Sequence, residues 1–422
     1  MTEPIETRRG ARRAAKGASG QTAQSVRHAR AGKRAKRMGI FGFIGVALAV
    51  VLVSATSVAA IAAWDVVNGA HTVDLGTTAK IGAIDGGFNV LIVGSDTRKG
   101  QGNFGVDPGS SLNDVNILLH VSADHKNATA VSIPRDMVVP IADCQGGGGG
   151  WTGPINATLS DGGLPCIVKT VEELTGMSIP YAGLITFDGV IDLSKAVGGV
   201  RVCVASSIDD PYTDLHLTAG WHTISGWTAL EFLRTRHGVG DGSDLGRISN
   251  QQVFLSALMR KIKDENLLAN PLTVYSMAKA VVSNMTLSTS LNSPDVIASM
   301  AMALKGIDLS KIVFVQYPGS TGGTGVYAGK VQPDEQAAAA LFTALQADKP
   351  VSVTGGLGRG STTGATPTPT PSVKASTSAT GSKSGSTKST ATPTPTPAQT
   401  AIPLDSNITG QTADQFTCSK GN

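Results

Sequence analysis

Short apolar runs alternate with stretches of helical periodicity between residues 85 and 349. The apolar runs predict buried strands at 88–94, 115–121, 128–133, 200–204 and 312–317. Two helices are predicted at 164–174 and 187–197. Four more are predicted from their starts: one capped by Ser225, one capped by Ser243 that runs to about Lys263, one that begins at Ser293-Pro294 and one that begins at Pro333. This alternation predicts an α/β fold in which a mixed central β-sheet is flanked by helices in an α-β-α arrangement.

A longer hydrophobic segment precedes this domain. Residues 38–63 carry no charged side chain, and about 20 apolar residues in a helix suffice to cross a bilayer. The basic tail (1–37) contains eleven Lys and Arg against two acids, which places the N-terminus in the cytoplasm. We therefore expect a single-pass transmembrane helix in the cell membrane, a linker at 64–84 and an extracellular domain at 85–349. A cleaved signal peptide ending near Ala60-Ile-Ala62 is the alternative, with an unusually long apolar core.

The basic tail lacks interleaved aromatic residues and any DNA-binding motif, so we expect a membrane partner and no nucleic acid. At the other end, residues 350–422 are rich in Ser, Thr, Pro and Gly, with Thr-Pro runs at 366–371 and 392–397. Few apolar side chains are available there to bury, which predicts a disordered C-terminal tail.

All four cysteines lie on the predicted outer side, where disulfides persist. Cys144 and Cys166 flank a glycine-rich loop, which favours their pairing. Cys203 and Cys418 would either pair or stay free. No Cys or His spacing suggests a zinc site.

Charged residues gather at the predicted strand ends. In the hairpin at 115–133, the start of the first strand and the end of the second meet at one sheet edge, so Asp114 and Arg135 should be neighbours. Asp96 follows the preceding strand directly, and it reaches the same edge if that strand pairs antiparallel with the hairpin. Ligands of α/β folds tend to bind outside such an edge.

A second polar cluster is helical. Asp244, Arg247 and Gln251 stand at i, i+3 and i+7 on one stripe, within the first two turns of their helix, where free N–H groups favour anions. Arg234 and Arg236 precede this helix. Arginine forks match phosphate oxygens, and paired aspartates suit Mg²⁺, which takes one or two carboxylates plus substrate phosphates. The two clusters together predict a site for a phosphate-bearing ligand and a metal.

The chain resembles the LytR-CpsA-Psr family of cell-wall glycopolymer transferases over residues 85–349. The resemblance rests on five motifs in family order, at 90–98, 113–114, 132–136, 232–237 and 244–252. It implies an enzyme, a Mg²⁺-dependent phosphotransferase. Such an enzyme moves a glycopolymer with one phosphate from a polyprenyl diphosphate lipid to peptidoglycan, at the muramic acid 6-hydroxyl, in cell-wall assembly. The lipid would lie in an apolar tunnel.

The motif match implies roles for individual residues. Asp96 and Asp114 would hold the metal and, with Arg135, form the catalytic set. The residues that bind the substrate diphosphate would be Arg98, Arg135, Arg234, Arg236, Asp244, Arg247 and Gln251. One departure stands out, because Asn250 occupies a position that is commonly Arg in the family and would remove a positive charge near the phosphates.

Two alternatives use the same residues differently. A polyprenyl diphosphate hydrolase, or pyrophosphatase, would use this site with water as the acceptor. A non-catalytic wall-binding or regulatory membrane protein, of the transcriptional attenuator type, would lack transfer altogether, although the acidic and arginine residues are in place.

Overall fold

The computed structural model describes residues 71–76, 86–97, 111–144, 150–364 and 400–422. The predicted basic tail, the predicted transmembrane helix at 38–63, most of the linker and Arg98 lie outside these ranges. Within them, no helix combines the length and the apolar character needed to span a bilayer.

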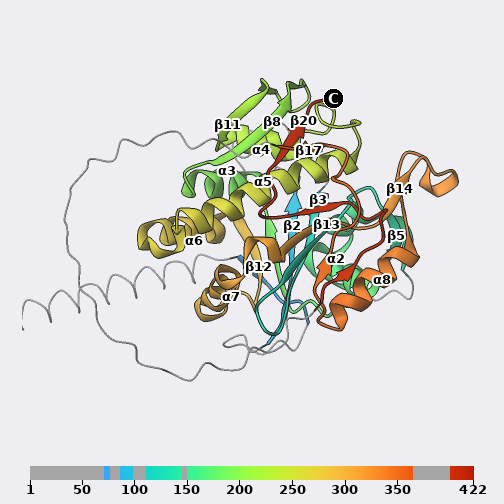
Figure 1. The fold of residues 1–422 in the computed structure, drawn as a ribbon. Coiled ribbons are helices and arrows are strands. Elements are labelled where there is room, and N and C mark those ends of the chain that lie inside the picture. The colour runs from blue at the N-terminus through green and yellow to red at the C-terminus, as the bar shows by residue number, and fades with distance from the viewer. Residues whose placement is uncertain (1–70, 77–85, 98–110, 145–149, 365–399) are drawn as a thin grey trace, which may run out of the picture. The chain divides into compact units, whose positions relative to one another are not determined.

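An eight-stranded mixed sheet forms the centre of the fold (Figure 1). Its order is β1 (His71–Val73), β12 (Met285–Ser288), β7 (Tyr181–Ile185), β2 (Phe88–Ser95), β3 (Asn113–Val121), β4 (Ala128–Ile133), β13 (Ile312–Gln316) and β19 (Gly410–Thr412). β3 pairs antiparallel with both β2 and β4, whereas β2 pairs with β7, and β4 with β13, in parallel. The predicted α/β class with a mixed central sheet is confirmed.

Helices cover both faces of this sheet. The covering helices are α2 (Thr158–Thr175) and α8 (Glu335–Gln346) on one face, and α5 (Asp244–Asp264) and α7 (Pro294–Gly306) on the other. Successive strand residues point to opposite faces. Leu91 accordingly packs in the core that includes Leu341 of α8, and Val90 packs in the core that includes Met300 of α7.

A smaller sheet lies over the other side of α5. Its strands are β11 (Gly220–Ile224), β8 (Val200–Ser206), β20 (Thr417–Lys420) and β17 (Ser361–Thr363), in this order. The helices α3 (Phe187–Ala196), α4 (Trp227–Arg234) and α6 (Pro271–Asn284) lie beside it (Figure 1). A third core joins this sheet to α5, with Val202 and Phe232 packed near Phe254.

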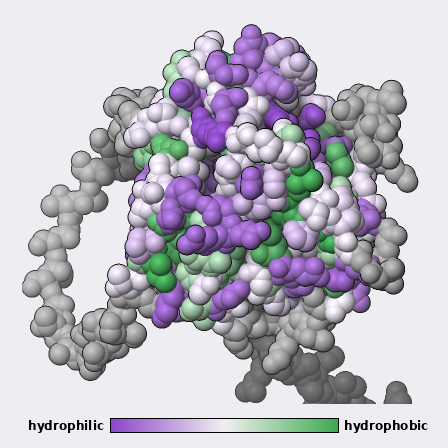
Figure 2. All heavy atoms as spheres, turned by 90° about the vertical axis from the view of Figure 1, so that its right-hand side faces the viewer, coloured by the Kyte–Doolittle hydropathy of each residue, from purple (hydrophilic) through white to green (hydrophobic). Residues whose placement is uncertain are grey.

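The remaining elements are short and connect the larger ones. They are β5 (Val138–Ile141), β6 (Trp151–Pro154), β9 (Ile208–Asp210), β10 (Leu215–Leu217), β14 (Gly319–Thr321), β15 (Val331–Pro333), β16 (Val351–Ser352), β18 (Ile402–Pro403), and the 3₁₀ turns at Ile155–Ala157, Leu267–Ala269, Leu309–Lys311 and Gly325–Tyr327. Figure 2 views the face with β5, β14 and α8, where hydrophilic and neutral residues interrupt smaller hydrophobic patches.

Two predicted helix starts need correction. The cap of α4 is Gly226, not Ser225, because the backbone there has a φ of 60° that favours glycine. α8 is opened by Asp334, whose side chain accepts a hydrogen bond from Ala337, while Pro333 ends β15. Ser243, in contrast, caps α5 as predicted by accepting from the Gly246 N–H.

The predicted disordered tail is wrong for its two described parts. Residues 350–364 and 400–422 contain five strands, of which β19 extends the central sheet and β17 and β20 extend the smaller one. Their few apolar side chains, such as Leu404 and Ile408, are buried in the main core. The fold therefore continues beyond the predicted boundary at residue 349. The Thr-Pro runs at 366–371 and 392–397 lie outside the described residues.

Both pairs of cysteines form disulfides. The favoured Cys144–Cys166 bridge is present and links residues 22 apart in sequence. Cys203 and Cys418 are also bonded, across a sequence separation of 215 residues. The second bridge joins the neighbouring strands β8 and β20, in which these two residues pair directly. It therefore ties the C-terminal strands to the domain.

Candidate active site

A β-bulge lies where the central hairpin reaches the predicted acidic cluster. Gly94 of β2 pairs with Val115 of β3. The next residue of β2, Ser95, pairs with Asn113, which leaves Asp114 as the extra residue. A bulge interrupts the alternation of a strand and re-aims a side chain. Here it presents the Asp114 carboxylate at the edge of the sheet.

Asp96 lies at the same edge. Its backbone N–H donates to the carbonyl of Leu112 over 3.1 Å, and its Oδ1 accepts from the Leu112 N–H over 2.7 Å. These bonds hold the two ends of the loop between β2 and β3 together. β2 pairs antiparallel with β3, which is the condition under which Asp96 was expected at this edge, and it brings Asp96 close enough for the charge of Asp114 to affect its pKa.

Arg135 follows the end of β4 and joins both clusters. Its guanidinium forms an ion pair with the Asp114 carboxylate, which confirms the neighbours predicted from the hairpin. Its main-chain N–H donates to Asp244 Oδ2 over 3.0 Å. The strand-end cluster and the helix stripe are therefore one site.

The first turns of α5 supply the second half of that site. Arg247 Nη2 lies 2.5 Å from Asp244 Oδ1, one turn earlier on the helix. The same nitrogen donates to the main-chain carbonyl of Asp114 over 2.8 Å, and Arg247 Nη1 is 4.0 Å from Asp114 Oδ2. Both side chains of the α5 pair are almost fully buried. Asp244 thus orients a guanidinium and anchors the chain at Arg135, a positioning role.

The segment after α4 carries the two other predicted arginines. Arg234 ends α4, and its guanidinium lies 4.4 Å from the centroid of the Phe187 ring. Arg236 is held by a buried carboxylate that the sequence did not single out. Asp210 accepts hydrogen bonds from the Thr235 hydroxyl over 2.6 Å and from the Arg236 N–H over 3.2 Å.

A third acid, Asp136, belongs to the site. Its carboxylate is buried and lies 3.6 Å from Arg135, 3.5 Å from Arg236 and 3.5 Å from Lys330. Lys330 precedes β15 and nothing in its sequence context indicated this contact. The adjacent Arg135-Asp136 pair was the available signal for Asp136.

An apolar cavity of about 310 Å³ opens beside this cluster. Its walls come from β2, β3, α3, α4 and α5, through residues such as Ile117, Val190 and Leu258. Four polar site residues also line it: Asp114, Arg234, Arg247 and Gln251. Gln251 is fixed by donating to the Leu233 carbonyl over 3.0 Å. Charged groups therefore border a space that is otherwise hydrophobic.

Burial and neighbouring charges shift the pKa values of three side chains in the site. Burial raises the pKa of the Asp96 carboxyl, and the charge of Asp114 adds to this, against a lowering by the Leu112 N–H and Arg135. Burial alone would lower the pKa of Arg135, but the carboxylates of Asp114, Asp136 and Asp244 raise it above its usual value. Burial also raises the pKa of Asp244, against the opposing charge of Arg247. Arg135 therefore stays cationic, and Asp96 holds a proton more readily than a free aspartate does.

The expected effect of Asn250 on the phosphates is not supported by its position. Its side chain is fully buried, donates to the Phe232 carbonyl and accepts from the Ser419 hydroxyl of β20. It is not among the residues that line the apolar cavity. Asn250 therefore joins α5 to the C-terminal strand, and its effect on the charge near the phosphates stays a prediction.

Fold and site together define an α/β protein in which carboxylates and arginines surround the mouth of an apolar cavity. Comparison with known protein families identifies the class of protein more closely. The model of the LytR_cpsA_psr family matches residues 53–347, well over half of the chain. The chain belongs to this family.

Curated relatives carry names from cell-wall biosynthesis. The cell wall biosynthesis protein LcpA of Corynebacterium glutamicum is 29% identical over 281 residues, which cover 59% of this chain and 53% of the relative. The teichoic acid transferase TagT of Bacillus subtilis, named as acting between polyisoprenyl-teichoic acid and peptidoglycan, is 34% identical over 182 residues, 42% of this chain and 53% of the relative. The matches thus span about half the length of these two relatives.

Solved structures share the fold. The Streptococcus agalactiae protein gbs0355 aligns with a TM-score of 0.52 at 22% identity and covers 62% of this chain and 88% of its own. Bacillus subtilis TagV aligns with a TM-score of 0.51 at 23% identity and covers 63% and 98%. At these identities the likeness concerns the arrangement of the elements alone.

Proposed function

We propose that this protein transfers a glycopolymer with one phosphate from a polyprenyl diphosphate lipid to the muramic acid 6-hydroxyl of peptidoglycan. The observation that carries the proposal is the apolar cavity bordered by Asp114, Arg234, Arg247 and Gln251. An amphiphile with a long hydrocarbon chain and an anionic head matches such a site, because the chain gains by leaving water and the head meets guanidinium groups. The family membership and the name of TagT support the same substrate class.

The arginines would bind the diphosphate and stabilise its charge during transfer. Phosphoryl transfer depends mainly on position and on electrostatic stabilisation of the transferred group. Arg135 and Arg247 are held in place by Asp114 and Asp244. Arg236 is oriented by Asp136 at 3.5 Å. Groups fixed in this way need little reorganisation when charge develops.

Asp96 and Asp114 fit a Mg²⁺ ion. The donor set is chemically right, because Mg²⁺ prefers carboxylate oxygens and substrate phosphates. The two carboxylates also disfavour each other, since the charge of Asp114 is one of the causes that raise the pKa of Asp96. A bound cation would relieve this repulsion. The metal would supply charge neutralisation at the diphosphate oxygens.

The acceptor hydroxyl must lose its proton, and Asp96 is the better placed of the two aspartates to take it. Asp114 is paired with the guanidinium of Arg135 and lies 4.0 Å from that of Arg247, so its oxygens are already engaged by cations. Asp96 makes neither contact, and burial raises its pKa. A carboxylate with a raised pKa is a stronger base.

For the whole chain we propose an uncleaved membrane anchor at 38–63, a cytoplasmic N-terminus and an extracellular catalytic domain. The two disulfides within the described domain support this topology, because such bonds persist in oxidising compartments. A lipid-linked donor held in the same membrane would then be close to the site.

Transfer can be separated from its rivals with one assay. Full-length protein is incubated with a labelled polyprenyl diphosphate-linked glycopolymer and Mg²⁺, with or without soluble peptidoglycan fragments. A transferase yields a fragment joined to the polymer by a phosphodiester. Release of polymer phosphate at the same rate without fragments indicates a hydrolase, and absence of both products with intact folding indicates a non-catalytic protein.

Variants connect this assay to the site. Asp96→Ala should reduce transfer by at least about 100-fold, as expected for loss of a metal ligand or base. Leu258→Trp should weaken donor binding by filling the apolar cavity. Leu272→Trp is the matched control, because Leu272 is on α6, 77% exposed and does not line the cavity. Wild-type transfer by Asp96→Ala would contradict its assignment.

A further inference from the structure

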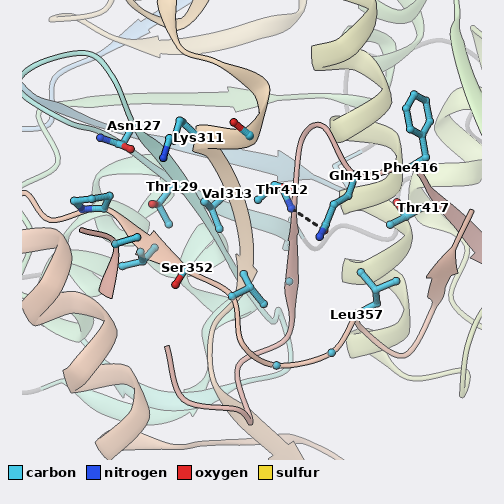
Figure 3. Close-up of a pocket in the computed structure, with 18 of the residues that line it drawn as sticks. Asn127, Thr129, Lys311, Val313, Ser352, Leu357, Thr412, Gln415, Phe416 and Thr417 are labelled. Carbon is cyan, nitrogen blue, oxygen red and sulfur yellow. Dashed lines mark hydrogen bonds between the residues drawn. The ribbon is translucent and has the colours of Figure 1, made fainter. Parts of the chain in front are cut away.

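A second and larger cavity, of about 650 Å³, lies between the central sheet and the C-terminal segment (Figure 3). One wall comes from β4 and β13, with Thr129 and Val313, and the other from residues 350–364 and 410–417. In Figure 3, Thr129 and Lys311 lie on one side and Leu357 and Thr417 on the other, with the Thr412–Gln415 turn between them. We call this space the C-terminal cleft.

The C-terminal cleft is separate from the candidate active site. Thr129 stands near the start of β4, whereas Arg135 follows the end of the same strand. The four steps of extended strand from Thr129 to Ile133 alone correspond to about 13 Å. The segment that forms its second wall also lies beyond residue 347, where the family match ends. One wall of the cleft is therefore built by chain that the family match does not include, and the other by strands inside it.

The lining combines polar and apolar surface and is nearly uncharged. Hydroxyl and amide side chains predominate, with glycine backbone beside them, and no described lining residue is acidic. Lys311 is the one cation among these residues, and it is exposed. Apolar surface is interspersed, from Val313, Val351 and Leu357.

One hydroxyl in the cleft wall has no partner. Thr417 is 3% exposed, and its Oγ1 makes no hydrogen bond within the described residues. A buried polar group left without a partner costs free energy, so such groups in folded proteins call for an explanation. Because this oxygen is almost closed to water in the empty cleft, a ligand hydroxyl would satisfy it only with a small shift of the cleft wall. Gln415 offers a second contact, since its Oε1 already accepts from the Thr412 N–H and its amide nitrogen remains a donor.

We propose that the C-terminal cleft binds a neutral oligosaccharide. Sugars combine many hydroxyl groups with apolar C–H faces, and they match a wall of hydroxyls, amides and short aliphatic side chains. The cavity volume falls within the roughly 300–1,000 Å³ of small-molecule sites. Among the described lining residues a metal cation finds no carboxylate ligand, and a phosphate would meet a single exposed lysine. This inference is independent of the proposed transfer reaction, because it concerns binding at another site.

The proposal is tested by filling the cleft. Gly356 lines it, has a φ outside the positive range, and a Cβ built there meets no atom within 4 Å. Gly356→Phe should therefore fold normally and occupy the ligand space. Gly306→Phe is the matched control, since Gly306 is equally unobstructed and does not line the cleft. Binding of chitotetraose and of a galactan tetrasaccharide to full-length protein is measured by isothermal titration calorimetry.

We expect saturable binding of at least one tetrasaccharide, weakened at least 10-fold by Gly356→Phe and unchanged by Gly306→Phe. Thr417→Val removes the unpaired hydroxyl at nearly constant shape, so it should weaken binding about five-fold without lowering thermal stability. Thr175→Val, which removes a hydroxyl bonded to the Val171 carbonyl, should leave binding unchanged. No binding of either sugar by the wild type, or equal binding by wild type, Gly356→Phe and Thr417→Val, overturns the proposal.

Discussion

The main-chain N–H of Arg135 donates a hydrogen bond of 3.0 Å to Oδ2 of Asp244, a residue 109 positions later in the chain. This bond joins the end of β4 to the first turn of α5. The other oxygen of Asp244 lies 2.5 Å from Arg247. One buried carboxylate therefore fixes a strand end and a guanidinium at once, and the geometry of the site depends on its charge.

Replacing Asp244 by Asn should lower the free energy of unfolding by about 3–5 kcal/mol, because it leaves the buried guanidinium of Arg247 with less compensation. Asn keeps an oxygen acceptor for the Arg135 N–H, so the loss reports on charge. Urea denaturation measures it. Asp241→Asn is the control: its pair with Arg359 is exposed on both sides, so the change should stay below about 1 kcal/mol. Equal losses in the two variants would contradict the role of Asp244.

Asn250→Arg should destabilise the protein without improving donor binding. The Asn250 side chain is fully buried between the Phe232 carbonyl and the Ser419 hydroxyl, two neutral groups that cannot neutralise a guanidinium. An uncompensated buried charge costs about 3–5 kcal/mol. Thermal unfolding and donor titration check the two parts. A variant of wild-type stability that binds the donor more tightly would show that this side chain reaches the phosphates.

Asp210→Asn should weaken the fold in a pH-dependent way. Burial would raise the pKa of Asp210, but the hydrogen bonds from Thr235 and from backbone N–H groups outweigh it and lower this pKa below its usual 3.8. A lowered pKa in the folded state means that the stabilisation is fully present above the unfolded value and is lost as the pH falls through the folded one. We expect a loss of about 1–3 kcal/mol at pH 7.

Urea unfolding between pH 7 and pH 3 measures the difference in the free energy of unfolding between wild type and Asp210→Asn. It should stay constant down to about pH 4 and shrink below it. A gap that widens on acidification would have the wrong sign. The Thr235→Val variant, which removes one donor and keeps the carboxylate, should lose less stability than Asp210→Asn.

The two disulfides should differ in their contribution to stability. In the chain-entropy model a bridge stabilises more when it closes a longer loop, by roughly 3 kcal/mol for the Cys144–Cys166 separation of 22 residues and roughly 5 kcal/mol for the Cys203–Cys418 separation of 215. The paired Cys→Ser variants of each bridge, compared by thermal unfolding, measure the two effects. A larger loss from the Cys144–Cys166 variant would contradict the order.

The hairpin geometry could be predicted because it follows from covalent connection. Two strands joined by a short turn must bring Asp114 and Arg135 to one edge, and they do. The stripe of Asp244, Arg247 and Gln251 followed from helical periodicity in the same way. In both cases the spacing of residues in the chain determines their spacing in the structure.

Long-range contacts could not be predicted in this way. Lys330 reaches Asp136, and Asp210 holds the Thr235–Arg236 turn, through folding that joins distant segments. The C-terminal strands were missed because their apolar residues are few and separated. Leu404 and Ile408 nevertheless find partners in a core formed by residues between Leu91 and Val351. The composition of this segment shows that it has too few apolar side chains to form a core of its own. It does not show whether these side chains can pack into the core of the preceding domain.

The position of β20 also has a consequence for how the chain acquires its structure. β8 pairs with β20, and Cys203 of β8 is bonded to Cys418 of β20 across a sequence separation of 215 residues. During N-to-C synthesis the smaller sheet is incomplete until β20 has been made, and pairings of such high sequence separation form slowly. Until β20 has been made, β8 therefore has one unpaired edge. A variant that lacks the residues of β20 would keep this edge exposed to pairing with other strands.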